Sequence, residues 1–267
     1  MPAIDPSRLE RQIAHVMEVF DDPRRLHARC LDLLEFYAAR VRQGANAGRV
    51  GSLRSLGVPS AVTRRLQQAL VERALRAPYA GAMAAETLWS SPVLEGRALA
   101  VALLECQPVA ALPDWVTAWS HTAADPHLLE TLAAGPMRRL WRERQDLFWA
   151  AVALDLTAED ASTTVALLAL EQVIPDLEPD DLPRLFAALE ASPVPGAGEA
   201  WRAYVAAVRV AVRRSPSEAA RFVVDEIEHA RPGASRLARQ ILADFPPRQR
   251  EAVRQALRLG ETSVLAP

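Results

Sequence analysis

The sequence contains no lysine, so all 31 of its basic residues are arginine. Against these stand 33 acidic residues, and the formal net charge of −2 gives the whole chain no general attraction for nucleic acid. The planar guanidinium of arginine suits contacts with phosphate, which would favour a nucleic-acid ligand. Codon bias towards a GC-rich genome would produce the same composition, so the count alone decides nothing about function.

Cysteine and long apolar runs are also scarce. Cys30 and Cys106 are too few and too far apart to predict a disulfide framework or a zinc site, and we expect both to be buried thiols. The first 20 residues carry several charges instead of an apolar signal-peptide core, and no later run approaches a membrane span. These absences favour a soluble, cytoplasmic protein without membrane contact.

The chain does contain many helix signals, and hydrophobic residues make up 50% of it. Ser91 and Pro92 form a typical N-cap and first helical position, and Leu94, Val101 and Leu104 then follow at helical spacing on one face. No alternating strand pattern occurs. The patterns predict helices at 6–19, 24–43, 59–77, 80–90, 92–106, 112–122, 126–141, 145–156, 158–173, 179–191, 197–214, 216–230, 233–244 and 247–259.

The helix-start signals recur at a regular spacing. They lie at Ser91-Pro92, at Asp125-Pro126, at Thr157 with Asp160, and at Ser215-Pro216 with Glu218, the last being a capping box. The first three are 34 and 32 residues apart, which is typical of stacked two-helix repeats. We therefore expect an all-α fold, an α-solenoid of HEAT-like antiparallel repeats. It would be one domain over 1–267 and one curved array, with N-terminal capping helices at 1–45 and repeats at 50–260.

Charge is unevenly distributed along the chain. Residues 150–200 carry many acids and a single basic residue, Arg184, whereas arginines are frequent on both sides of that segment. Such patchiness is compatible with a basic groove and an acidic outer edge.

Several motifs resemble those of the HEAT-like-repeat DNA alkylation repair proteins, which include the AlkD-type glycosylases. The most specific is Leu88-Trp89-x-x-Pro92-x-x-Glu95, which is similar to the family's Leu-Trp-x-x-Pro-x-x-Glu hairpin. The other matches are Leu56-Gly-Val-Pro59 leading into Thr63-Arg-Arg-Leu66, Asp146-Leu-Phe-Trp149-Ala-Ala-Val-Ala153, and the arginine-bearing helix from Arg209 to Pro216. The resemblance covers roughly residues 50–260.

The resemblance implies that the protein binds duplex DNA on a concave, arginine-lined surface. It also implies excision of positively charged alkylated purines, 3-methyladenine and 7-methylguanine. In such enzymes a carboxylate and aromatic faces stabilise the cationic sugar as the base leaves. No cofactor is implied.

The catalytic motif of that family departs from its pattern here. The family has Trp-Trp-Asp-x-x-Asp on a helix, and the corresponding helix of this chain starts Asp125-Pro-His-Leu-Leu-Glu130, without either tryptophan. Glu130 is then the candidate catalytic carboxylate, and the alternative is a solvated acid near a helix start. The family's later tryptophan falls near Ala206 and is also missing, although Trp201 and Tyr204 are close in sequence.

Arginines and tryptophans are the candidate DNA contacts. Arg138, Arg139 and Arg142 share one stretch of helix, and Arg209 and Arg213 are four residues apart on another. The alternative is a solvated face paired with neighbouring acids. Trp115, Trp119 and Trp149 could stack on a sugar or base, or could fill the core between repeats.

The sequence offers little support for other chemistry. His121, Asp125 and His127 are near one another but lack the spacing of a helical metal pair, so we expect a loop with an N-cap aspartate and no metal. No glycine-rich phosphate loop, nucleophile elbow or kinase signature occurs. Two functions therefore remain: a DNA-binding protein of the DNA repair type, or a non-catalytic scaffold that binds a protein partner.

Overall fold

The structure is a computed structural model of the chain, and it describes residues 4–41, 49–50, 53–123, 125–158 and 161–264. The fold is all-α, as the sequence predicts. Its contacts divide the chain into two compact units, Met1–Glu143 and Arg144–Pro267, which are described separately below. The expectation of one continuous array concerns both units together and stays a prediction. No helix within the described ranges is both long enough and apolar enough to cross a membrane.

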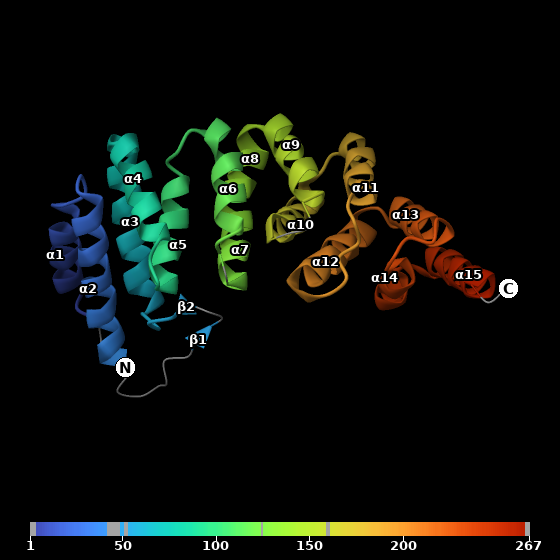
Figure 1. Cartoon of the computed structure of the whole chain (residues 1–267), viewed down its shortest axis with the longest axis horizontal. Helices are drawn as coiled ribbons and strands as arrows, with labels where there is room; N and C mark the ends of the chain where they lie inside the picture. Colours follow the sequence, from blue (N-terminus) through green and yellow to red (C-terminus); the bar gives the residue numbers. More distant parts are fainter. Residues whose placement is uncertain (1–3, 42–48, 51–52, 124, 159–160, 265–267) are drawn as a thin grey trace. The chain divides into compact units, whose positions relative to one another are not determined.

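Unit 1 consists of helical hairpins (Figure 1). Its helices are α1 Pro6–Met17, α2 Pro23–Val41, α3 Ser60–Arg76, α4 Pro78–Trp89, α5 Leu94–Leu104, α6 Leu112–Ser120, α7 Pro126–Leu132 and α8 Arg138–Glu143. Helices α1, α3, α5 and α7 contact one another in succession, and α2 contacts α4 beside them. Two short strands that the sequence pattern does not predict, β1 (Arg49–Val50) and β2 (Leu53–Arg54), pair antiparallel.

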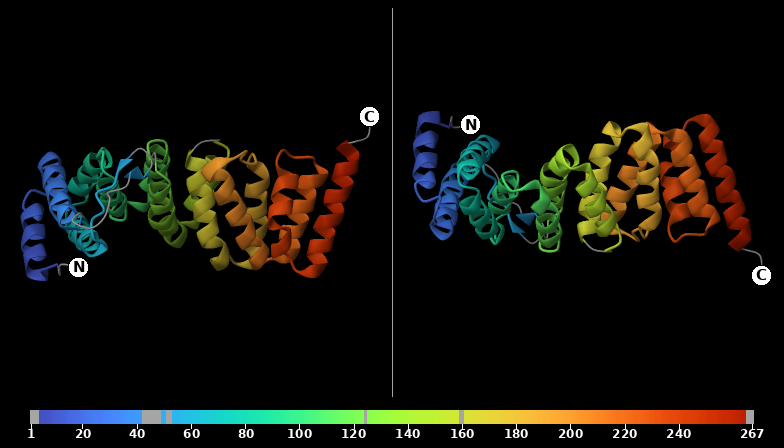
Figure 2. Two further views of the ribbon diagram at one scale, coloured as in Figure 1. Left: turned by 90° about the horizontal axis from the view of Figure 1, so that it is seen from below. Right: turned by 90° about the horizontal axis from the view of Figure 1, so that it is seen from above.

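Unit 2 has two rows of helices. Its elements are α9 Gln145–Leu156, α10 Ala161–Val173, α11 Leu182–Ala191, α12 Gly198–Arg214, α13 Pro216–Glu228, α14 Ala234–Ile241 and α15 Pro247–Val264. Helices α9, α11, α13 and α15 contact one another in succession, as do α10, α12 and α14 (Figures 1 and 2). Each helix therefore packs against the helix two places along the chain.

Apolar side chains fill the interior of both units. Phe20 and Leu66 are fully buried in unit 1, and Phe148 and Phe222 are buried in unit 2. Full burial of such a side chain stabilises the fold by roughly 1.5–3 kcal/mol.

All fourteen predicted helices are present, with boundaries that shift by a few residues. At α7 the local signal works as predicted, because the Asp125 carboxylate accepts a hydrogen bond from the His127 backbone N–H at 2.9 Å. At α13 the helix does begin at Pro216, but the Ser215 side chain makes no capping bond, so the predicted capping box does not form. Asp160, part of another predicted start, lies outside the described residues.

The predicted helix 92–106 starts two residues later than expected. Val93 has extended backbone and bridges in parallel to Arg54, whose N–H donates to the Pro92 carbonyl at 3.3 Å. The Ser91 hydroxyl oxygen accepts from the Val93 N–H at 3.2 Å, and a Cβ on Gly96 would lie 2.6 Å from it. This contact with a distant segment delays the helix start.

The predicted helix 126–141 is interrupted by a π-helical turn at Ala133–Met137. Pro136 lies inside this turn. Proline has no N–H to donate and its ring clashes with the carbonyl four residues earlier, so the regular α-helical ladder cannot continue through it.

Candidate functional site

The five predicted phosphate-binding arginines divide into two groups. Arg139 is directed inward: its side chain is 19% exposed, and Nη1 donates to the backbone carbonyls of Glu105 at 2.6 Å and Gln107 at 2.8 Å. Its Nε also donates to the Glu143 carboxylate at 2.8 Å. Arg139 therefore completes the C-terminal end of α5, where backbone carbonyls have no donor within the helix.

Arg209 has a similar role in unit 2. Its Nε pairs with the Asp244 carboxylate at 3.0 Å, and its Nη2 donates to the Gln240 carbonyl at 3.1 Å. Other arginines that donate to backbone carbonyls in this unit include Arg214 (to Leu177 O), Arg231 (to Glu190 O) and Arg236 (to Gly196 O). The fold thus uses many of its guanidiniums internally.

The second group lies on the surface. Arg138, Arg142 and Arg213 are all exposed, and Arg138 takes part in a further contact. Within the described part of the chain, no ion pair includes Arg142 or Arg213. These two guanidiniums keep their donors available for a ligand.

The tryptophans of unit 1 lie mainly in the core. Trp119 is 5% exposed and stacks on Trp89, with ring centroids 4.4 Å apart and planes 4° from parallel. Trp115 is half-buried and meets Trp119 edge-on at 5.2 Å. Arg97 lies over the Trp89 ring at 5.1 Å, and the Trp89 indole donates to the Thr122 hydroxyl at 2.9 Å. The packed rings join α4 to α6. Trp119 therefore fills the core between helices, which was the alternative to stacking on a sugar or base.

The aromatic residues of unit 2 are buried as well. Trp149 is 3% exposed, and the Arg184 guanidinium lies 5.2 Å from its ring centroid. Trp201 is 4% exposed beneath Arg236, and Tyr204 is fully buried. In this conformation the faces of these rings contact protein.

Glu130, the candidate catalytic carboxylate, lies on the exposed side of α7. Its side chain is 63% exposed, and His127 Nδ1 is 3.6 Å from its Oε2. Water screens a carboxylate in this position, so its stabilisation of a nearby cation is weak compared with that from a desolvated site.

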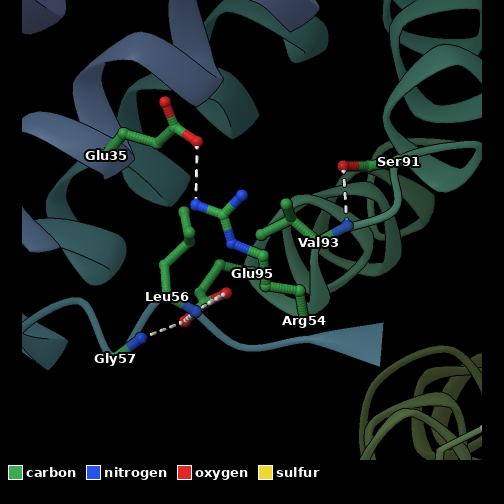
Figure 3. A network of polar contacts seen from close by, with 7 residues as sticks. All are labelled: Glu35, Arg54, Leu56, Gly57, Ser91, Val93 and Glu95. Atoms are coloured by element: carbon green, nitrogen blue, oxygen red, sulfur yellow. Dashed lines mark hydrogen bonds and ion pairs between the residues drawn. The ribbon is translucent and has the colours of Figure 1, made fainter. Parts of the chain in front are cut away.

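The two motifs that carry the resemblance near the N-terminal end meet in space (Figure 3). The Glu95 carboxylate accepts the backbone N–H groups of Leu56 and Gly57, both at 2.9 Å, and the Ser55 hydroxyl at 3.1 Å. Gly57 has a φ of +69°, which favours glycine in this turn. Glu95 thereby connects residues 55–57, which lead into α3, to the first turn of α5.

Neither metal ligands nor reactive thiols form a site in the described residues. His, Cys, Asp and Glu side chains nowhere gather there in threes with the geometry to hold a metal ion. Cys30 is buried, which raises the pKa of its thiol to about 12 and keeps it protonated. Cys106 is half-buried, and burial raises its pKa as well.

Unit 2 contains a buried acid that the sequence pattern does not indicate. Glu226 is 3% exposed, with Oε1 3.3 Å from Arg231 Nε, while its Oε2 has no hydrogen-bond partner among the described residues. Ala230, at φ +50°, turns the chain at the end of α13 so that the Arg231 N–H reaches the Glu226 carbonyl. Burial raises the pKa of Glu226, and Arg231 opposes that rise. In the sequence, the end of α13 near Ala230 is the only signal that could have indicated the burial of Glu226.

Comparison with known proteins finds no matching family model, curated protein or solved structure.

Arg139 and Arg142 should differ in their effect on stability, although they are three residues apart. Arg139→Met should lower the free energy of unfolding by about 2 kcal/mol, because it leaves the partly buried Gln107 carbonyl without this donor and removes the bonds to Glu105 and Glu143. Arg142→Met should change it by less than about 0.5 kcal/mol, as expected for an exposed side chain. Denaturant unfolding of both variants measures the difference, and equal effects would contradict the internal role of Arg139.

Glu226 should make stability depend on pH. Its folded-state pKa is raised, so its contribution is fully present below the unfolded pKa of about 4.3 and is lost as pH rises through the folded pKa. The free energy of unfolding should therefore fall over that window relative to Glu226→Gln. Other titratable groups surround Glu226, namely Asp225, Glu190, His229, Arg231 and Tyr204. Because His229 also changes charge with pH, the comparison is repeated in a His229→Gln background. Parallel pH curves for parent and variant would contradict the assignment.

Proposed function

We propose that this protein binds duplex DNA through the phosphate backbone, as an α-solenoid of HEAT-like repeats related to the DNA alkylation repair type. Three findings support the proposal. Alternate helices pack in succession within each unit, the Glu95 contact joins two of the motifs that carry the resemblance, and Arg142 and Arg213 are exposed. The exposed arginines carry the functional part of the argument.

Arg142 and Arg213 are suited to phosphate because the fold does not use their guanidiniums for ion pairs within the described ranges. By contrast, Arg139 and Arg209 are held by carboxylates and carbonyls. A free guanidinium can donate two parallel hydrogen bonds to a phosphate without first breaking an internal contact. Arg138 is exposed on the same helix as Arg142 and can add a further contact.

Base excision is not needed for this proposal. The Glu130 carboxylate is open to water, and Trp119 and Trp149 are packed in the core. Excision of 3-methyladenine or 7-methylguanine would require bound DNA to remove water from Glu130. We therefore propose DNA binding as the function and keep excision as a separate test.

A protein-binding scaffold is the second candidate, and one observation favours it. The side chains of Leu75, Tyr79 and Met83, at the junction of α3 and α4, are 62%, 82% and 39% exposed. Exposed aromatic and methionine side chains are enriched at protein interfaces. Binding through such a surface would change little with salt, whereas phosphate binding weakens steeply as salt rises.

The double variant Arg142→Gln/Arg213→Gln should bind duplex DNA more weakly than the parent. Loss of two phosphate contacts should also reduce the slope of log K against log salt by about 2. Fluorescence anisotropy over a salt series measures both quantities. Arg202→Gln is the control, because Arg202 is exposed on α12 and paired with Glu199. The proposal fails if the parent does not bind DNA, or if the double variant matches the control.

Base release is tested on a duplex carrying 7-methylguanine at enzyme excess and low salt. If Glu130 acts on the sugar cation, the parent releases free base above the spontaneous rate and Glu130→Gln reduces release by at least about tenfold. The same variant should bind the duplex as the parent does. Equal release by parent and variant would remove Glu130 from any mechanism.

A further inference from the structure

A groove between α13 and α15 in unit 2 has a basic lining. It has a volume of about 330 Å³, and Arg221 and Arg248 line it from the two helices. Ser217 and Gln249 supply further polar groups, and Ala220 and Ala252 supply small apolar surfaces. No acidic residue lines this groove.

Neighbouring acids do not neutralise the two arginines. Glu218 and Asp225 are three and four residues from Arg221, the spacing at which helical ion pairs form. Even so, no ion pair among the described residues includes Arg221 or Arg248. Glu251, three residues beyond Arg248, is instead paired with Arg254 at 2.5 Å and lies 4.0 Å from Arg258.

A contact across the groove holds its walls together. The Gln249 amide donates to the Ser217 hydroxyl oxygen at 3.1 Å, which joins the first turn of α15 to the first turn of α13. Ser217 can still donate its own hydroxyl hydrogen. The groove therefore presents two guanidiniums and a hydroxyl donor on helices that are already packed together.

We infer that this groove binds a phosphate group through Arg221 and Arg248. Each guanidinium offers parallel N–H donors that match two oxygens of a phosphate. A carboxylate has only two oxygens and one charge, so one arginine would satisfy it. A tetrahedral phosphate presents oxygens to both walls at once, and it suits two uncompensated positive charges better. The inference does not depend on DNA binding by Arg142 and Arg213.

The phosphate has two possible sources: a small phosphorylated molecule, or the backbone of a nucleic acid. Inorganic phosphate represents the first source and an unmodified duplex the second, each titrated in phosphate-free buffer. The variants are Arg221→Gln and Arg248→Gln. Arg258→Gln is the control, because it removes the same charge from α15 about 15 Å along the helix from Arg248. Circular dichroism checks that all variants are folded.

If the groove binds small phosphates, the parent and the control should bind inorganic phosphate by calorimetry, and each groove variant should weaken that binding by roughly tenfold. If the source is a nucleic-acid backbone, the groove variants should lose affinity for the duplex but not for inorganic phosphate. The control should keep its affinity for the duplex. Either result supports the inference. Groove variants that match Arg258→Gln in both titrations would overturn it. Phosphate binding retained by Arg142→Gln/Arg213→Gln would separate this site from the proposed DNA contacts.

Discussion

The fold depends on arginine side chains that donate hydrogen bonds to carbonyl oxygens at the ends of other helices. Arg139 reaches Glu105 and Gln107, Arg214 reaches Leu177, and Arg231 reaches Glu190, across 32 to 41 residues of sequence. That separation is close to the spacing of 32 to 34 residues between helix-start signals, so each bond joins neighbouring hairpins. The last carbonyls of a helix have no donor of their own, and one guanidinium carries five N–H groups. Apolar packing brings the hairpins together, and the arginines then donate to exposed and partly buried carbonyls at the helix ends.

This use of arginine changes what the composition means. In a chain whose basic residues are all arginine, a run such as Arg138, Arg139 and Arg142 suggests a uniform basic face. In the structure, adjacent members of the run have different roles: Arg139 belongs to the interior, whereas Arg142 is exposed. On α12, Arg209 is paired with Asp244, whereas Arg213 is exposed and in no ion pair among the described residues. Only arginines that do not bond to helix-end carbonyls are therefore available to bind phosphate. The total number of arginines overstates how many are available.

The same distinction explains what the sequence could predict. Helix positions follow from local signals, and Asp125 before Pro126 starts α7 because its carboxylate meets an N–H two residues away. One prediction was wrong because a distant segment intervened: Arg54 holds Val93 in extended backbone, and the helix starts late. The inward turn of Arg139 depends on carbonyls more than 30 residues away, and the stacking of Trp119 on Trp89 depends on packing between two helices. The apolar pattern of a single helix predicts neither the inward direction of Arg139 nor the stacking of Trp119. The candidate site was therefore less predictable than the fold.

Three glutamates show what catalysis would require beyond DNA binding. A carboxylate stabilises a cationic sugar most strongly when it is ionised, open to the sugar and in a site that excludes water. Glu95 is ordered, but backbone N–H groups already occupy its oxygens. Glu226 is shielded, but burial raises its pKa and Arg231 is its partner. Among the described residues, Glu130 has only His127 near it, at 3.6 Å, but its side chain is 63% exposed to water. None meets all three conditions in the protein alone, so any excision would depend on DNA to exclude water from Glu130. The proposed phosphate binding by Arg142 and Arg213 needs no such change, because both residues are already exposed.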